Sequence, residues 1–156
     1  MRDSLPVLAH NRIDVLHGVN LDQLGRRDPK HYGGLTLDRL EQQITVYARE
    51  LGLEVRFFQT NAESEFVEHL HRIPGTVDGV LLNPGAWTHY SYAIRDALEI
   101  AALPAVEVHL SAVDEREDFR KISVIRDLCL ATVSGQGVAG YRVALEHLRS
   151  ALEGAE

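Results

Sequence analysis

The sequence predicts a single α/β domain in which five parallel strands form one sheet with helices on both faces. The chain has 156 residues, of which 45% are hydrophobic and 25% are charged, and this size and composition are usual for one globular domain. Short runs of apolar, β-branched residues alternate with amphipathic stretches of helical spacing over residues 13–152. Regular alternation of this kind is typical of a parallel sheet whose connecting helices cover both faces.

The first half of the chain is expected to contain three of the strands and two of the helices. The apolar run over 13–19 reaches glycine and is followed by asparagine, which predicts the first strand. Thr36 can cap a helix over 36–51, whose apolar residues recur with helical spacing, and Gly52 can end it. The elements that follow are a strand over 53–60, a helix over 63–73 that ends before Pro74-Gly75, and a fully apolar strand over 80–82.

The second half of the chain repeats the same alternation after a turn at Asn83-Pro84-Gly85. Its expected elements are a helix over 91–101, a strand over 104–110, a short helical piece over 114–119, a fifth strand over 128–133 and an amphipathic helix over 138–152. Five strands in this length suggest a flavodoxin-like, doubly wound sandwich. One domain is expected to span 1–156, with 1–11 as a flexible arm and 153–156 as a frayed tail.

Several classes of protein are excluded by composition. A formal net charge of -7 argues against a sequence-independent nucleic-acid binder, because the phosphate backbone requires a basic partner. The single cysteine, Cys129, allows neither an intrachain disulfide nor a cysteine zinc cluster, and this fits a reducing compartment. Near the N-terminus no long apolar run follows a basic start, so neither a signal peptide nor a membrane span is expected. The chain is therefore predicted to be cytoplasmic.

No cofactor or metal site is predicted. Residues 135–140 approximate the GxGxxG motif of dinucleotide sites, but they lie in the last strand-helix unit and leave too little chain for a ribose-binding acid. Tight packing of helix on sheet is the favoured interpretation. His17, Asp22, Asp28 and His31 do not have the spacing of a known metal site, and no HExxH motif occurs.

A site for a small polar ligand is expected where the strands end, because active sites of this fold class collect at the carboxyl ends of strands. The residues expected there are mostly small or polar: Gly18, Val19, Asn20, Asn61, Asn83, Pro84, Gly85, His109, Leu110, Ser111, Gly135, Gln136 and Gly137. The segment 20–35 is longer than most connections, and its length and glycines suggest a lid that closes over substrate. Within it, guanidinium charge from the neighbouring Arg26 and Arg27 would favour the phenolate of Tyr32 and make it a candidate base, although a surface tyrosine is the alternative.

Glu107 and His109 are two residues apart on a strand, so both side chains point to one face of the sheet. The carboxylate could orient the imidazole as an acid, or the two could form a satisfied polar contact in the core. His89 follows a strand end and is either a site residue or an exposed residue at a helix start. Arg116 and Arg120 could clamp a carboxylate, but a solvated helix face is favoured.

The other histidines of the chain have weaker indications of a function. His17 lies within the first strand and could equally be a core histidine. His31, His69, His71 and His147 have no partner that the sequence identifies, and no function is predicted for them.

From residue 13 to residue 152 the chain resembles the type II 3-dehydroquinate dehydratases. Seven motifs of that family occur here in the same order. They are Gly18-Val19-Asn20-Leu21, Leu24-Gly25-Arg26-Arg27-Asp28-Pro29-Lys30-His31-Tyr32-Gly33, Asn83-Pro84-Gly85-Ala86-Trp87-Thr88-His89, Ala93-Ile94-Arg95-Asp96-Ala97, Val106-Glu107-Val108-His109-Leu110-Ser111, Arg116-Glu117-Asp118-Phe119-Arg120 and Gly135-Gln136-Gly137-Val138-Ala139-Gly140-Tyr141.

The resemblance implies a dehydratase that forms 3-dehydroshikimate from 3-dehydroquinate without a cofactor, in the shikimate pathway. By this resemblance, Tyr32 is the base held as phenolate by Arg27, Asn20 stabilises the enolate through a water, and His109, oriented by Glu107, is the acid. The resemblance also implies assembly of trimers into a homododecamer, in which Asp96 reaches a neighbouring subunit's site. The implied substrate-binding residues are Asn83, His89, Asp96, Leu110, Ser111 and Arg120.

The chain departs from the family pattern beside the first strand end. His17 stands where the family usually has asparagine, Val19 replaces the usual proline, and Asp22 replaces a frequent asparagine. Two alternatives to a 3-dehydroquinate dehydratase of the shikimate pathway remain open. One is a paralogue that dehydrates a related ring, such as amino-dehydroquinate, or serves quinate catabolism. The other is a flavodoxin-like binding module without catalysis.

Overall fold

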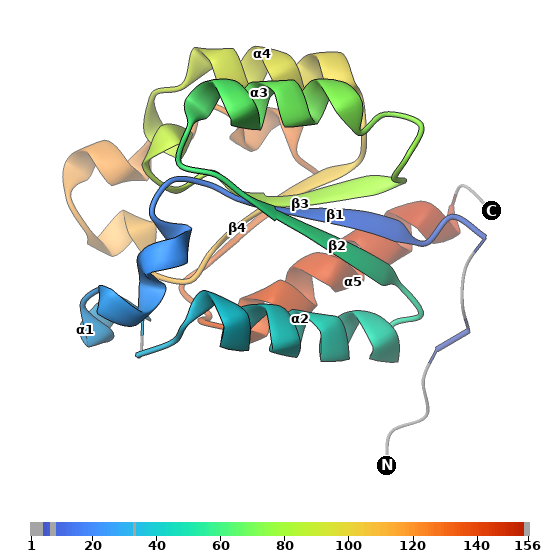
Figure 1. Ribbon diagram of the computed structural model, residues 1–156, viewed down its shortest axis with the longest axis horizontal. Helices are drawn as coiled ribbons and strands as arrows, with labels where there is room; N and C mark the ends of the chain where they lie inside the picture. Colours follow the sequence, from blue (N-terminus) through green and yellow to red (C-terminus); the bar gives the residue numbers. More distant parts are fainter. Residues whose placement is uncertain (1–4, 7–8, 33, 155–156) are drawn as a thin grey trace.

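Five parallel strands form the centre of the molecule in the computed structural model, which describes residues 5–6, 9–32 and 34–154. The strands are β1 (Arg12–His17), β2 (Glu54–Gln59), β3 (Gly79–Asn83), β4 (Ala105–His109) and β5 (Ala131–Ser134). Their order in the sheet is β2-β1-β3-β4-β5, which is the flavodoxin-like order, and every neighbouring pair is parallel. The predicted α/β fold with a five-stranded parallel sheet is therefore confirmed (Figure 1).

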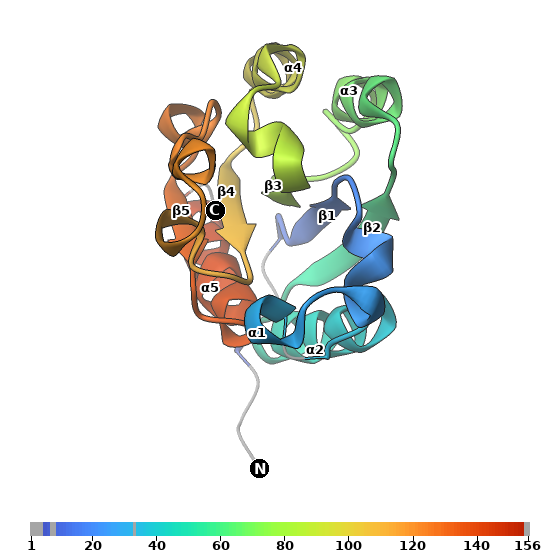
Figure 2. The same ribbon diagram turned by 90° about the vertical axis from the view of Figure 1, so that its left-hand side faces the viewer.

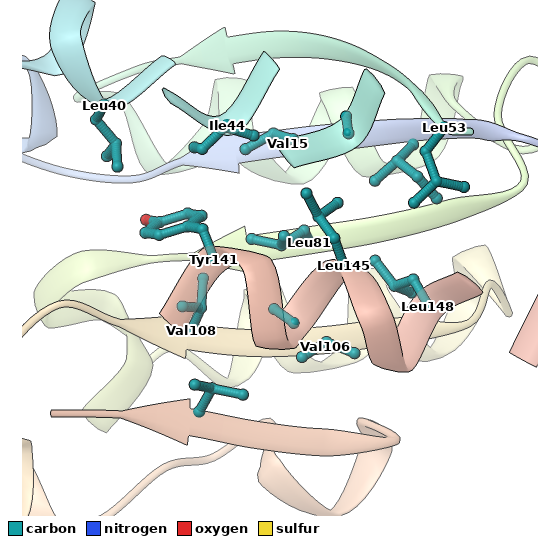
Figure 3. Packing of buried hydrophobic residues seen from close by; sticks show 14 of the residues in the cluster. Val15, Leu40, Ile44, Leu53, Leu81, Val106, Val108, Tyr141, Leu145 and Leu148 are labelled. Atoms are coloured by element: carbon teal, nitrogen blue, oxygen red, sulfur yellow. The ribbon is translucent and has the colours of Figure 1, made fainter. Parts of the chain in front are cut away.

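Helices cover both faces of the sheet (Figure 1). Helices α2 (Leu37–Glu50) and α5 (Ala139–Glu153) lie on one face, and α3 (Glu63–Arg72) and α4 (Tyr92–Ala101) lie on the other. Because side chains alternate along a strand, each face of the sheet has its own apolar core. Figure 3 shows the first core, in which Val15, Leu81 and Val108 of the strands pack with Ile44 of α2 and Leu145 of α5.

Local sequence signals account for several helix ends. The Thr36 hydroxyl accepts a hydrogen bond from the Arg39 N–H at 3.3 Å, so the predicted cap of α2 is confirmed. Gly52 follows α2 with a φ of 68°, a conformation that favours glycine. A Cβ on Gly140 would lie 3.2 Å from Cγ1 of Val133, so α5 packs closely on β5. Close packing explains this glycine without a dinucleotide.

The long connection after β1 contains two short helices rather than open loop. The 3-10 segment η1 (Leu21–Arg26) is followed by α1 (Pro29–Tyr32). Leu21 and Leu24 are buried in the first core, and this anchors the segment to the body of the protein. The helical piece expected over 114–119 is also different, because Arg116 is extended between the 3-10 segments η3 (Val113–Glu115) and η4 (Asp118–Lys121).

The chain ends are described only in part. The Leu5 N–H donates to the Glu50 carbonyl at 3.0 Å, and Arg149 donates to the Pro6 carbonyl at 3.0 Å. The expected flexible arm and frayed tail fall partly on residues 1–4, 7–8 and 155–156, which lie outside the described residues, and they stay predictions. Within the described part of the chain, no helix has the length and apolar character needed to cross a membrane.

Candidate active site

A cavity of about 100 Å³ opens at the edge of the sheet where the strands end. Figure 2 looks onto this edge, with α1 in front, near α2 and α5. The predicted residues that line the cavity are Asn20, Arg27, Tyr32, Asn83, His89, His109, Leu110, Ser111 and Arg120. Side chains predicted from five separate parts of the sequence are thus brought together in space.

The turn after β1 is set by close contact with the turn after β3. A Cβ on Gly18 would lie 2.2 Å from the Pro84 carbonyl oxygen, so only glycine fits there. Asn20 has a φ of 69°, and its N–H donates to Oδ1 of Asn61 at 2.8 Å. Oδ1 of Asn83 accepts from the Gly85 N–H at 3.0 Å. These contacts fix the backbone that carries both asparagines of the cavity.

Tyr32 lies between two guanidinium groups. Arg116 donates to the Tyr32 hydroxyl at 3.0 Å and lies 3.4 Å from Oγ of Ser111. Cζ of Arg27 lies 4.4 Å from the centre of the Tyr32 ring and so stacks on its face. Arg116 lines the cavity, so the prediction that it lies on a solvated helix face was wrong. Of these two cations, only Arg116 has a hydrogen bond to the phenolic oxygen itself.

Glu107 and His109 form a buried pair, in which His109 lines the cavity and Glu107 lies behind it. Nε2 of His109 lies 2.6 Å from Oε2 of Glu107, and the Ser123 hydroxyl donates to Oε1 of Glu107 at 2.7 Å. Burial raises the pKa of Glu107, but the hydrogen bonds and charge of His109 and the Ser123 hydroxyl outweigh it, so this pKa is lowered. Glu107 is therefore a carboxylate at neutral pH. Because a carboxylate only accepts, Nε2 carries hydrogen and Nδ1 is left for a ligand.

His89 and Arg120 complete the far wall of the cavity. Nδ1 of His89 donates to the Ile122 carbonyl at 2.7 Å, so Nε2 is the nitrogen left for a ligand. Burial, aided by the positive charges of His109 and Arg120, lowers the pKa of His89. Its free nitrogen is thus a hydrogen-bond acceptor at neutral pH. Arg120 pairs with Glu117 at 2.8 Å and lines the cavity, so the solvated face was the wrong interpretation for Arg120 too.

Some residues singled out in the sequence lie outside this cavity. Asp96 is exposed on α4 and does not line it, so its role toward a neighbouring subunit stays a prediction. His69 was expected to have no partner, yet it lies 2.6 Å from the buried Asp14. His17 is fully buried, 3.0 Å from Glu41. Burial raises the pKa of Cys129 to about 12, so this thiol is a poor nucleophile.

The cavity is suited to a small anion with hydroxyl groups. Its wall contains three arginines and no aspartate or glutamate among the described residues. The remaining polar groups are the amides of two asparagines, the hydroxyls of Tyr32 and Ser111, and the imidazoles of His89 and His109. Among the residues that the structure describes, no group of three His, Cys, Asp or Glu side chains could hold a metal ion.

Comparison with known proteins identifies the family. The sequence model described as "Dehydroquinase class II" matches residues 11–149. A 3-dehydroquinate dehydratase of Pelotomaculum thermopropionicum is 49% identical over 86% of this chain and 93% of its own length. One from Thermotoga maritima is 46% identical over 91% and 97%. The crystal structure of type II dehydroquinase from Propionibacterium acnes has 40% identity and a TM-score of 0.85, covering 92% of this chain and 99% of that one. The chain belongs to the class II dehydroquinase family.

Proposed function

We propose that this protein is a hydro-lyase that converts 3-dehydroquinate to 3-dehydroshikimate and serves the shikimate pathway. The observation that carries the proposal is that one cavity contains both Tyr32, which is bound by Arg116, and His109, which is bound by Glu107. Tyr32 is placed to carry negative charge as a base, and His109 is placed to carry positive charge as an acid. An elimination that needs both a base and an acid requires this combination.

The base step is assigned to Tyr32. Its phenolate removes a proton from the carbon beside the ring ketone, and the electron pair moves onto the ketone oxygen as an enolate. Arg116 and Arg27 favour the phenolate before the transfer. Asn20, fixed by its backbone bond to Asn61, stabilises the enolate oxygen through a water molecule.

The acid step is assigned to His109. The enolate electrons return to form the carbon-carbon double bond, and the departing hydroxyl takes a proton and leaves as water. Because Nε2 donates to Glu107, that proton comes from Nδ1, so His109 must act as an imidazolium. Glu107 is ionised and stabilises this positive charge. Both steps use side chains of the chain alone, and no cofactor or metal enters the scheme.

The other residues of the cavity are assigned to binding. Arg120 and the backbone of Leu110 and Ser111 suit the carboxylate and hydroxyl oxygens of the ring. The neutral ring of His89 accepts from a substrate hydroxyl through Nε2, and Asn83 donates from its amide nitrogen, since its oxygen is taken by Gly85. No nucleic-acid or membrane partner is part of the proposal.

Self-association is proposed from exposed apolar side chains on and near α4. Tyr92 and Ile100 on this helix are about 70% exposed, at 69% and 70%, and Ile122 and Leu130 lie exposed on the segment that follows β4. Exposed apolar patches built from several such side chains often mark protein–protein interfaces. We propose a homododecamer of four trimers in the cytoplasm, in which Asp96 reaches the site of a neighbouring subunit. Light scattering of the purified protein would show twelve chains per particle, and a monomer would contradict the assembly.

The proposed reaction is tested by mixing the purified protein with 3-dehydroquinate in the presence of a chelator. The product is a conjugated enone, so its ultraviolet absorbance reports turnover directly. Rapid growth of the absorbance is expected. A flat trace from folded protein that still binds the compound would contradict the dehydratase and favour a binding module.

A further inference from the structure

A second cavity adjoins the active-site cavity. It has a volume of about 370 Å³ and is bordered by α1, the start of α2 and the turn before α5. The two cavities share Tyr32 and Leu110 in their walls. A ligand in the second cavity would therefore lie next to the proposed base. Nothing in the reaction described above uses this space.

The wall of this second cavity is positively charged. Lys30, His31 and Arg39 line it, and no aspartate or glutamate does so among the described residues. The side chains of Lys30 and Arg39 are exposed and form no ion pair within the described part of the chain. Asp28, the acid nearest to Lys30 in sequence, accepts the backbone N–H of Lys30 at 3.0 Å. The charge of the two cations is thus not cancelled by a bound carboxylate.

Other basic residues of the fold are, by contrast, paired with carboxylates. Arg12 is bound to Asp78, Arg142 to Glu50, and Arg149 to Glu153. A third cavity of about 370 Å³ is also lined by Lys30 and His31, together with Arg116 and a single acid, Glu115. The positive field around Lys30 therefore extends from the surface to the guanidinium that binds Tyr32.

We propose that the second cavity is an entry site for carboxylate anions, where Lys30 and Arg39 hold the substrate before it moves past Tyr32 into the active-site cavity. The identification of the anion as 3-dehydroquinate rests on the proposed function. The physical need is clear, since a chain with a net charge of -7 repels an anion at long range. A local positive field reverses this repulsion at the mouth of the site and raises the rate of productive encounter.

The two cations also determine which ligands the second cavity favours. Lys30 presents a mobile point charge and Arg39 a planar fork, so together they suit a small carboxylate and offer nothing to a neutral ring. Because both side chains are exposed, their effect depends on ionic strength. Their contribution is to capture of the substrate and not to the chemical steps.

The test compares the parent protein with a Lys30→Gln/Arg39→Gln double variant. The matched control is Arg49→Gln/Arg72→Gln, which removes two exposed arginines from the last turns of α2 and α3, at neither cavity. Both double variants change the net charge equally. For Lys30→Gln/Arg39→Gln, kcat/KM for 3-dehydroquinate is expected to fall about three- to tenfold at 10 mM salt and less than twofold at 0.5 M, with kcat unchanged.

A binding measurement makes the test independent of turnover. Calorimetry at low salt with citrate as the probe is expected to show binding to the parent and control proteins, and binding at least threefold weaker to Lys30→Gln/Arg39→Gln. Equal citrate affinity in all three proteins would overturn the entry site, as would a loss of kcat that persists at high salt. If the parent protein bound citrate in this pattern but left 3-dehydroquinate unchanged, the proposed reaction would fail while the anion site would stand.

Discussion

Replacing Glu107 by glutamine isolates the role of one negative charge. The glutamine oxygen can still accept from Nε2 of His109, and its amide can donate to the Ser123 hydroxyl, so the geometry of the buried pair is kept. What is lost is the charge that stabilises imidazolium. Charge-assisted hydrogen bonds are roughly twice as strong as neutral ones, so the loss is about 1–2 kcal/mol of stabilisation. This corresponds to a fall in kcat of about 5- to 30-fold.

The assay is kcat for 3-dehydroquinate as a function of pH. Without the carboxylate, the positive charge that His109 carries in the acid step has no counter-ion, so kcat is expected to fall at every pH measured. The control is Asp14→Asn, because Asp14 is also buried and lies 2.6 Å from a histidine, His69, but away from the cavity. Asp14→Asn is expected to lower stability and to leave kcat within twofold.

The lowered pKa of Glu107 has a separate consequence for stability. A carboxyl group with a lowered pKa stabilises the fold above its ordinary value of 4.5, and this contribution is lost as the pH falls through the lower value. The free energy of unfolding of the parent protein should therefore approach that of Glu107→Gln as the solution is acidified below that value.

In the kinetic experiment, a kcat of Glu107→Gln within twofold of the parent at every pH would refute the assigned role of the charge. An equal loss of kcat in Asp14→Asn would refute it as well.

Three further substitutions test other contacts. Arg116→Gln removes the guanidinium that donates to the Tyr32 hydroxyl and is expected to lower kcat about 10- to 100-fold, whereas a kcat within twofold of the parent would contradict a role for this contact. His89→Ala removes one neutral acceptor and is expected to raise KM about 2- to 10-fold, and an unaltered KM would exclude a bond to substrate. Gly18→Ala forces a Cβ against the Pro84 carbonyl and should lower the free energy of urea unfolding by about 1–3 kcal/mol, while a change below 0.5 kcal/mol would mean that the turn yields easily.

The fold could be predicted from the sequence because its signals are local. Apolar β-branched runs specify the strands, and the hydroxyl of Thr36 specifies where α2 begins. The short helices after β1 were not predicted, since their stability comes from burial of residues such as Leu21 and Leu24 against distant parts of the chain. Propensity alone does not report that burial.

The candidate site was predicted in part. Strand-end position identified Asn83 and His109, and the two-residue spacing placed Glu107 on the same face as His109. Arg116 was assigned to solvent because a charged residue on a short helical piece is usually exposed. Its contact with Tyr32 joins residues 84 positions apart, and no spacing along the chain indicates such a contact.

Tyr32 is proposed as the base of the reaction, and the substitution Tyr32→Phe removes the proton-accepting group alone. The substitution removes one oxygen and keeps the ring on which Arg27 stacks. Turnover of 3-dehydroquinate and calorimetric binding would be measured on the same preparation. Affinity is expected to stay within a few-fold of the parent while kcat falls by about two to four orders of magnitude. A variant that binds normally and retains more than a tenth of the parent kcat would contradict the assignment.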